Sequence, residues 1–357
     1  MINVTKTYLP DVEKYKSYVD KIFKSGFLTN NGQFVRKLEK RLEEYLNVEN
    51  LILVSNGTIA LQLAYKALEL SKEVITTPFT FAATVSSQVW EGLIPVFADI
   101  NAETFCIDYK KIENLITNKS KAIIPVHVFG NACNIDEIEK IAYKNNLKVI
   151  YDAAHTFGVK YKNKSILSYG DISIISFHST KLFHTIEGGA LVIKDDEIYN
   201  KVKLMINFGI SGPEKINGLG INAKMNEFQA AMGLCVLDDM DKILEGRKRV
   251  HNFYINNLSK ELQLQKYNEH CTRNYAYFPV VFETQKVLKN VIEGLNKNDI
   301  FPRRYFYPSL DMLSYLKNSK YMSISNNISS KILCLPIYDS LEEEELQQIV
   351  AIINSSI

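Results

Sequence analysis

The chain has 357 residues, enough for one large domain with a smaller one or for two comparable domains. Its 46% hydrophobic and 23% charged content is ordinary for a soluble globular protein. The formal net charge is +2, from 42 basic and 40 acidic side chains, so nothing in the charge balance favours nucleic acid or an anionic membrane as a partner.

The start of the chain lacks the apolar run of a secretory signal, and no apolar run approaches the ~20 residues needed to span a bilayer. The five cysteines are odd in number and scattered, and no two have C-x-x-C spacing. We therefore expect a reduced, cytoplasmic protein without a structural zinc site. The cysteines are Cys106, Cys133, Cys235, Cys271 and Cys334.

The first two thirds of the chain alternate between helix and strand signals. A helix is predicted over residues 33–46, where apolar side chains recur at helical spacing. Strands are expected where short apolar runs begin at residues 51, 73, 94, 121 and 147, and again over 171–176 and 188–193. The helices between the earlier strands are expected over 57–68, 81–92, 108–116 and 134–145. This alternation indicates a largely parallel α/β sheet with helices on both faces.

After about residue 224 the pattern changes. The elements expected there are a long helical region over 224–262, a strand over 275–283, and helices over 284–298 and 340–354. Ser340 and Glu343 are spaced as a capping box for the last helix. We therefore expect a large domain over residues 1–235 and a small α+β domain over 236–357.

Polar residues follow several of the predicted strands. Gly57 and Thr58 open a helix, where N–H groups and a hydroxyl could bind an anion. Phe81 lies at the start of the next helix, and Asp152 directly follows the apolar run "KVIY". Taken singly, the first pair could be a plain helix start and Phe81 a core residue. An acid after a buried strand is usually paired or functional, and ligands collect at this edge of a parallel sheet.

A lysine completes this set. Lys181 lies in "SFHSTKLFHTIEGG", a loop between two predicted strands that is rich in hydroxyls and histidines. Together these groups suit pyridoxal 5'-phosphate (PLP), whose aldehyde needs an amine, whose ring nitrogen needs a carboxylate and whose phosphate needs N–H and hydroxyl donors. A metal cluster is disfavoured, because the histidines show no local two-ligand spacing. The histidines considered are His127, His155, His178 and His184.

The ordered motifs "SNGTIAL", "TPFTFAAT", "YDAAH", "SFHSTKLFHTIEGGA" and "GINAKMNEFQAAMG" resemble those of the DegT/StrS-type sugar aminotransferases. The resemblance extends over nearly the whole chain, from "LTNNGQFVRKLE" to "RRYFYPSL". It implies an aspartate aminotransferase-like fold type I enzyme with a large, mostly parallel sheet domain. It also implies PLP as the cofactor, L-glutamate as the amino donor and a nucleotide-linked keto sugar as the acceptor.

Site roles follow from the same resemblance. Lys181 is expected to be the Schiff-base lysine and proton shuttle, and Asp152 the partner of the cofactor's ring nitrogen. His155 is expected beside the phenolic oxygen, and Phe81 on the ring face. The phosphate is expected to contact Gly57, Thr58, Ser176 and, from the neighbouring subunit, Asn222.

The substrate side is expected to include Thr29, His178, Arg304 and Tyr307. Tyr307 stands before the proline of "RRYFYPSL", where the family usually has histidine. This variant is most similar to enzymes that form dTDP-4-amino-4,6-dideoxyglucose from the 4-keto sugar for O-antigen or related surface polysaccharides. The pair Arg303–Arg304 could equally be a solvated surface pair or bind a nucleotide diphosphate.

Other functions remain open at this level. A UDP-linked or a 3-keto sugar could be the acceptor. A non-catalytic PLP-binding regulator is disfavoured because no DNA-binding segment is recognised, and a dehydratase is disfavoured because Lys181 is present where such enzymes carry histidine.

A homodimer with shared active sites is expected from Asn222. The polar run "SGPEKINGLG" before it looks like an exposed excursion, which in the family crosses to the partner subunit. The plainer alternative is that Asn222 caps the helix beginning near Lys224.

Overall fold

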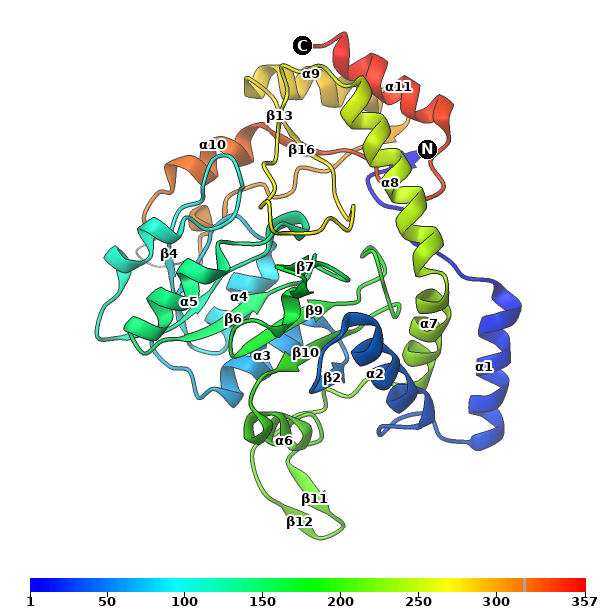
Figure 1. Ribbon diagram of the computed structural model, residues 1–357, viewed down its shortest axis with the longest axis vertical. Coiled ribbons are helices and arrows are strands. Elements are labelled where there is room, and N and C mark those ends of the chain that lie inside the picture. Colours follow the sequence, from blue (N-terminus) through cyan, green and yellow to red (C-terminus); the bar gives the residue numbers. More distant parts are fainter. Residues whose placement is uncertain (317–318) are drawn as a thin grey trace.

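A seven-stranded sheet forms the centre of the molecule, with spatial order β2-β10-β9-β6-β5-β3-β4 (Figure 1). The computed structural model describes residues 1–316 and 319–357. The strands are β2 (Leu51–Val54), β3 (Glu73–Thr76), β4 (Ile94–Phe97), β5 (Ser120–Ile124), β6 (Lys148–Asp152), β9 (Ile172–Ser176) and β10 (Gly189–Ile193). β10 is antiparallel to both of its neighbours, and the pairs among β9, β6, β5, β3 and β4 are parallel. The prediction of a largely parallel sheet is confirmed.

Both faces of this sheet are buried, because alternate side chains of each strand enter different hydrophobic clusters. In β2, Leu51 and Leu53 pack on one side, whereas Ile52 and Val54 pack on the other. This two-residue alternation is what a doubly covered sheet requires. The helices of this part are α2 (Gln33–Leu46), α3 (Gly57–Ala67), α4 (Ala82–Trp90), α5 (Ile135–Lys144) and α6 (Asp196–Met205).

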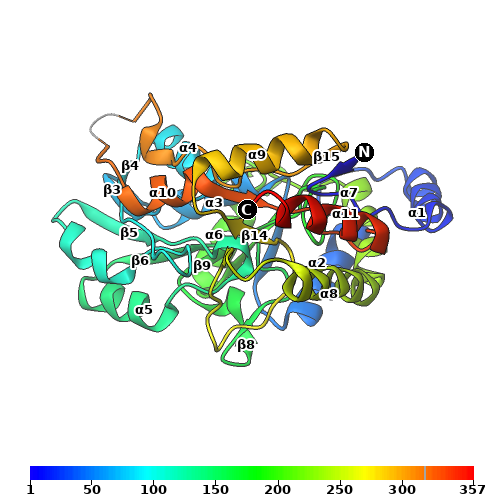
Figure 2. The same ribbon diagram turned by 90° about the horizontal axis from the view of Figure 1, so that it is seen from above.

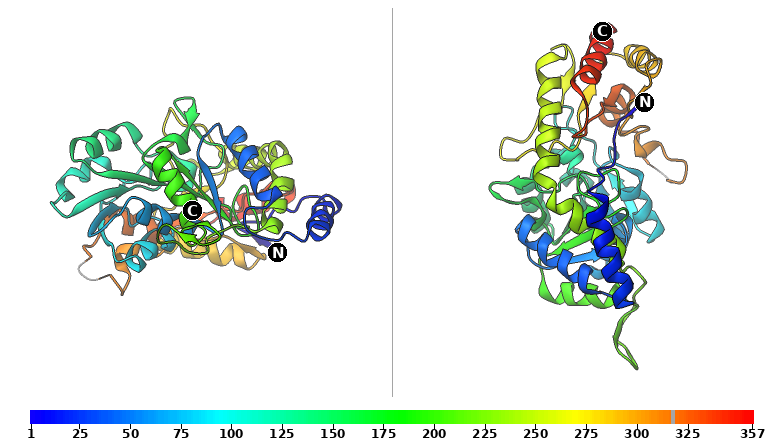
Figure 3. Two further views of the ribbon diagram at one scale, coloured as in Figure 1. Left: turned by 90° about the horizontal axis from the view of Figure 1, so that it is seen from below. Right: turned by 90° about the vertical axis from the view of Figure 1, so that its right-hand side faces the viewer.

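Two helices outside the sheet connect the halves of the molecule. α7 (Glu227–Asp238) packs against α2 and against α1 (Val12–Ser25), which lies at the side of the body (Figures 1 and 3). α8 (Met240–Asn257) then continues from α7 after a break at Asp239. The expected boundary at residue 235 therefore falls inside α7, and the domain division itself remains a prediction.

The C-terminal part is an α+β layer with its own hydrophobic cluster. It holds a three-stranded antiparallel sheet of order β13-β14-β16. Its elements are β13 (Gln263–Leu264), β14 (Pro279–Val281), α9 (Gln285–Asn296), β15 (Ile300–Phe301), α10 (Ser323–Lys331), β16 (Ile332–Cys334) and α11 (Glu343–Asn354). Strand β1 (Ile2–Asn3) also lies here, because it pairs in parallel with β15 (Figure 2).

Smaller elements complete the chain. The hairpin β11 (Ile210–Gly212) and β12 (Lys215–Ile216) projects from the body near α6 (Figures 1 and 3). A second small pair is β7 (Lys160–Tyr161) and β8 (Lys164–Ser165). The short 3-10 helices are Tyr109–Lys111, Glu113–Leu115, Val128–Gly130, Ile166–Ser168 and Leu310–Met312. In the described part of the chain, no helix combines the length and the apolarity that crossing a membrane requires.

Two local predictions are wrong. The stretch 108–116 forms two separate 3-10 turns instead of one α-helix, since so short a segment gains too few hydrogen bonds to offset helix nucleation. The capping box of the last helix involves Glu342 and Glu345, two residues after the predicted pair.

Candidate active site

Eight of the expected site residues line one cavity of about 350 Å³. They are Gly57, Thr58, Phe81, Asp152, His155, Ser176, His178 and Lys181. The cavity lies at the carboxyl ends of β2, β6 and β9, because Asp152 and Ser176 are the last residues of their strands. The fold thus brings together segments that are distant in the sequence at the edge where parallel sheets bind ligands.

The Lys181 side chain is half-buried in the loop between β9 and β10. Its Nζ donates a hydrogen bond to the Tyr277 hydroxyl at 3.1 Å. Burial lowers the pKa of this amine to about 8, although Asp152 and Tyr305 oppose the shift. An amine with such a pKa exchanges protons readily near neutral pH, which suits a nucleophile and a general acid or base.

The Asp152 carboxyl is 5% exposed and faces the same cavity. Its Oδ2 accepts from the Thr84 hydroxyl at 2.7 Å, and its Oδ1 accepts from the Ala154 N–H at 3.2 Å. Burial raises the pKa of Asp152, and these two hydrogen bonds and the Lys181 charge only partly oppose that shift. A carboxylate held this way binds strongly to a cationic N–H placed opposite it.

The His155 ring is fixed by the backbone of a neighbouring turn. The Phe129 N–H donates to His155 Nδ1 at 3.1 Å, so the proton of the neutral ring is on Nε2. Phe129 has φ 58°, in the left-handed region, and this conformation points its N–H at the ring. Burial, followed by the Lys181 charge, lowers the pKa of His155 well below its ordinary value. His155 therefore presents a neutral N–H donor.

The start of α3 forms a candidate anion site. The N–H groups of Gly57 and Thr58 donate to no protein acceptor in the described part of the chain. A Cβ at Gly57 would lie 3.1 Å from Ser176 Cβ, and a Cβ at Gly189 would lie 2.8 Å from the backbone of Asn56. Glycine at both positions therefore lets β10 and β9 approach this turn closely. Open N–H groups at a helix start, with nearby hydroxyls, favour a phosphate.

Four expected site residues lie elsewhere. Thr29 is exposed between α1 and α2, and Asn222 is exposed at the base of the hairpin, where it forms a bridge with Asn207. Asn222 does not cap α7, because the N-cap of that helix is Asn226. Tyr307 is half-exposed, and its ring packs on the Arg304 guanidinium.

Arg304 and its neighbour Arg303 point in different directions. Arg304 Nη2 donates to the carbonyl oxygens of Ser329 and Ser330, at the C-terminal end of α10. Arg303 instead lines the cavity. Sequence reasoning did not choose Arg303, and it also missed other lining residues. These are Asn56, Thr84, Glu187, Tyr277, Tyr305 and Phe306.

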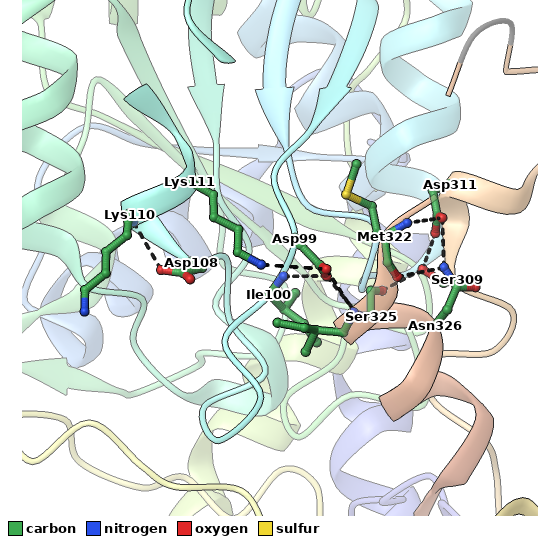
Figure 4. A network of polar contacts seen from close by, with 11 residues as sticks. Asp99, Ile100, Asp108, Lys110, Lys111, Ser309, Asp311, Met322, Ser325 and Asn326 are labelled. Carbon is green, nitrogen blue, oxygen red and sulfur yellow. Dashed lines mark hydrogen bonds and ion pairs between the residues drawn. The ribbon is translucent and has the colours of Figure 1, made fainter. Parts of the chain in front are cut away.

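A polar network holds the start of α10 and the residues Ser309 and Asp311, which follow Tyr305 and Phe306 in the chain (Figure 4). The Asp99 carboxylate accepts from the N–H groups of Ile324 and Ser325, each at 2.9 Å, at the start of α10. Asp311 accepts from the Met322 N–H at 2.9 Å and from Asn326 Nδ2 at 2.8 Å. Two buried carboxylates therefore secure α10 and the preceding loop against the end of β4.

The fold, together with a cavity that contains the Lys181 amine and the Asp152 carboxyl, is that of an aminotransferase. The chain belongs to the DegT/DnrJ/EryC1/StrS aminotransferase family, whose model matches residues 11–354. The chain is 43% identical to the dTDP-4-amino-4,6-dideoxy-D-glucose transaminase of Shigella dysenteriae, over 99% of this chain and 98% of that protein. It is 38% identical to the Escherichia coli protein of the same name, with the same coverage.

Solved structures have the same fold. The crystal structure of DesI in the presence of its TDP-sugar product matches with a TM-score of 0.94 and 29% identity, over 99% of this chain and 92% of DesI. The PLP form of the sugar aminotransferase Spr1654 from Streptococcus pneumoniae matches with a TM-score of 0.91 and 25% identity, over 98% of each chain. The predicted fold type I architecture is confirmed.

Proposed function

We propose that this enzyme transfers an amino group from L-glutamate to dTDP-4-dehydro-6-deoxy-D-glucose, using PLP and forming dTDP-4-amino-4,6-dideoxy-D-glucose. The observation that carries the proposal is one cavity containing the Lys181 amine and the Asp152 carboxyl in a chain 43% identical to a transaminase of that name. The expected use of the product is O-antigen or another surface polysaccharide, made from a nucleotide sugar in the cytoplasm.

The residues present fit PLP. Gly57, Thr58 and Ser176 offer N–H and hydroxyl donors to its phosphate, and Asp152 offers a buried carboxylate to its ring nitrogen. Phe81 lies at the cavity wall, where an aromatic ring can stack on the cofactor. When bound, PLP supplies an electron sink that stabilises negative charge on the carbon losing a proton.

Lys181 would carry the protons of the reaction. With PLP held in the cavity, the Lys181 amine would act as the general base and acid that moves the proton at the α-carbon of the amino donor. The same amine would serve the reverse transfer when the keto sugar is bound. The hydrogen bond from Lys181 Nζ to Tyr277 keeps the amine directed along the cavity wall.

Asp152 and His155 are proposed to bind the ring nitrogen and the phenolic oxygen of the cofactor and so to tune its electron distribution. The Asp152 carboxylate would hold the protonated ring nitrogen of the cofactor, which would then accept negative charge into its ring. His155 would offer its Nε2–H to the phenolic oxygen, because Nδ1 is occupied by the Phe129 N–H. The His155 ring lies nearly parallel to the neighbouring rings of Phe129 and Phe306, with centroids 6.1 and 5.9 Å away, and this packing keeps it in one orientation.

The proposed working unit is a homodimer. The hairpin segment exposes apolar side chains that nothing in this chain covers within the described residues, among them Ile216 (72% exposed) and Leu219 (77%). A second copy burying this segment would bring Asn222 to the partner's phosphate site, and its cover would also keep water from the reacting groups.

The experiment is a substrate panel with the purified, PLP-loaded protein and L-glutamate. The acceptors are dTDP-, UDP- and GDP-linked 4-keto sugars and a dTDP-linked 3-keto sugar, and the products are identified by mass and proton NMR. A GDP sugar belongs in the panel because a GDP-perosamine synthase is 31% identical to this chain. We expect the dTDP-linked 4-keto sugar to react fastest. Faster reaction of the 3-keto sugar, or no aminated product, would overturn the proposal.

A further inference from the structure

Two polar groups of the cavity, His155 and Lys181, both lie against Tyr277. The rings of His155 and Tyr277 have centroids 4.6 Å apart, and Lys181 Nζ donates to the Tyr277 hydroxyl at 3.1 Å. His155 and Lys181 follow β6 and β9 of the large sheet, whereas Tyr277 lies just before β14 of the C-terminal layer. The relative placement of these groups therefore depends on how the segment before β14 is attached to the large sheet.

One side chain makes that attachment. Asn274 is 3% exposed, and its Nδ2 donates to the carbonyl oxygens of His155 at 2.9 Å and Phe157 at 3.1 Å. Its Oδ1 accepts from the Ala276 N–H at 3.2 Å. Because the two carbonyls need a donor and the N–H needs an acceptor, the amide satisfies all three in one orientation only. Asn274 thus joins the backbone that carries His155 to the turn that leads into Tyr277.

The turn that leads into Tyr277 needs such support. Tyr275 has φ 56°, in the left-handed region that a bulky side chain rarely adopts. The next residue is fixed on both sides, since the Ala276 N–H donates to Asn274 and the Ala276 carbonyl accepts from Arg247 Nη1 at 3.2 Å. Arg247 comes from α8 and is 4% exposed. Buried hydrogen bonds thus hold a strained turn, and the turn sets the position of the side chain that follows it.

Asn274 also lies against the turn that fixes the His155 ring. A Cβ at Gly130 would lie 2.8 Å from Asn274 Oδ1 and 3.1 Å from the His155 carbonyl oxygen, and the φ of Gly130 is 86°. Glycine therefore lets this turn approach the amide closely. The residue before it, Phe129, donates its N–H to His155 Nδ1. The Asn274 side chain thus lies beside both backbone segments that determine where the His155 ring points.

Asn274 is not among the described residues that line the cavity, so it can act on the reaction only through its neighbours. We infer that Asn274 is a positioning residue, which holds His155 against Tyr277 and so aligns the His155 Nε2–H with the Lys181 amine. The inference rests on the proposed function and adds to it a residue outside the cavity. A displacement of about 1 Å caused far from the chemistry can cost on the order of 100-fold in rate. Loss of Asn274 should therefore lower kcat and leave substrate binding nearly unchanged.

The test combines kinetics with a readout that needs no cofactor. In Asn274→Asp the side chain keeps its size and an acceptor for Ala276, but it loses the donor to both carbonyls. We expect kcat with L-glutamate and the keto sugar to fall roughly 10- to 100-fold, and the KM of each substrate to change by less than about threefold. In the apoprotein labelled with ¹⁵N-histidine, NMR should show His155 as a single Nε2–H tautomer in the native chain and as a mixture of tautomers in the variant. His155→Ala assigns its signal among the six histidines.

Tyr254→Phe is the matched control, because it also removes a buried hydrogen bond from the C-terminal layer, the one to the Pro336 carbonyl at 2.8 Å. It should lower the melting temperature and retain the native kcat and His155 tautomer. Asn274→Ala, with the same expected results, replaces Asn274→Asp if that variant does not fold.

Four results would overturn the inference. Three concern the Asn274 variants: a native kcat, a raised KM at native kcat, or an unchanged His155 tautomer. The fourth needs no variant, and it is a mixture of His155 tautomers in the native apoprotein. If the native enzyme aminates no keto sugar, the proposed function fails instead, and the tautomer measurement still tests the role of Asn274.

Discussion

The loop that carries Lys181 and the segment that carries Asn222 are built in opposite ways. In the first, Phe183 stacks on Phe157 at 4.5 Å and the Thr185 N–H donates to the Phe177 carbonyl. In the second, Ile216 and Leu219 face solvent. The loop that carries Lys181 is therefore packed entirely within its own chain, whereas the segment that carries Asn222 leaves apolar side chains uncovered. A substitution in the Lys181 loop should affect the active site of its own chain. A substitution at Asn222 should affect the active site of the partner subunit.

The largest effect is expected from Lys181→Ala. No other lysine lines the cavity among the described residues, so turnover and the absorbance of covalently attached cofactor should both be abolished. Absorbance spectra and steady-state assays measure this. Lys148→Ala, at an exposed ion pair with Asp171, is the control and should remain active. A Lys181→Ala protein that transaminates at the native rate would contradict the assignment.

Asp152→Asn should retain cofactor but lose roughly 100-fold or more in rate. An amide cannot keep the ring nitrogen protonated, and removing one such charge contact costs a few kcal/mol in the transition state. Single-turnover kinetics test this, with the absorbance spectrum as a check that cofactor is still bound. Near-native kinetics in the variant would show that the carboxylate has a different role.

Asn222→Ala should lose about tenfold in activity, because the proposed hydrogen bond to the phosphate in the partner's site would be removed. The informative experiment mixes it with Lys181→Ala after dissociating and re-forming dimers. If sites are shared, a mixed dimer has one site with both lesions and one site with neither, so activity recovers toward one working site. Unchanged activity despite proven mixed dimers would mean that each chain builds its own site.

The smallest expected effect is that of pH on the rate at which the apoenzyme takes up its cofactor. The neutral Lys181 amine attacks the cofactor aldehyde, and its pKa of about 8 lies below that of an ordinary lysine. Cofactor uptake by the apoenzyme should therefore rise about fivefold between pH 7 and pH 8 and level off above pH 9, since the amine is then deprotonated. Stopped-flow absorbance measures the rate. A rise that continues to pH 10 would show an unperturbed lysine.

The sequence predicted the sheet and the strand-end residues because their signals are local. Asp152 follows a run of apolar residues, and such a run ends at the edge of a parallel sheet. The sequence analysis assigned Arg304, and not Arg303, to the substrate side, because "RRYFYP" has no alternation that reveals which of the two faces the cavity. That choice is made by the pairing of Arg303 with Cys334, a contact between residues far apart in the chain. Tyr277 was missed because its place beside Lys181 likewise depends on a contact between residues far apart in the chain.

The pairing of β1 with β15 has a consequence for how the chain is made. The partner of Ile2 is Ile300, which is synthesised almost 300 residues later. At about 5–20 residues per second, this strand waits roughly 15 to 60 s on the ribosome before its partner exists. During that time the large sheet can form while the first strand stays unpaired. Ordering of the first strand should therefore be among the last folding events, after the C-terminal layer has left the ribosome.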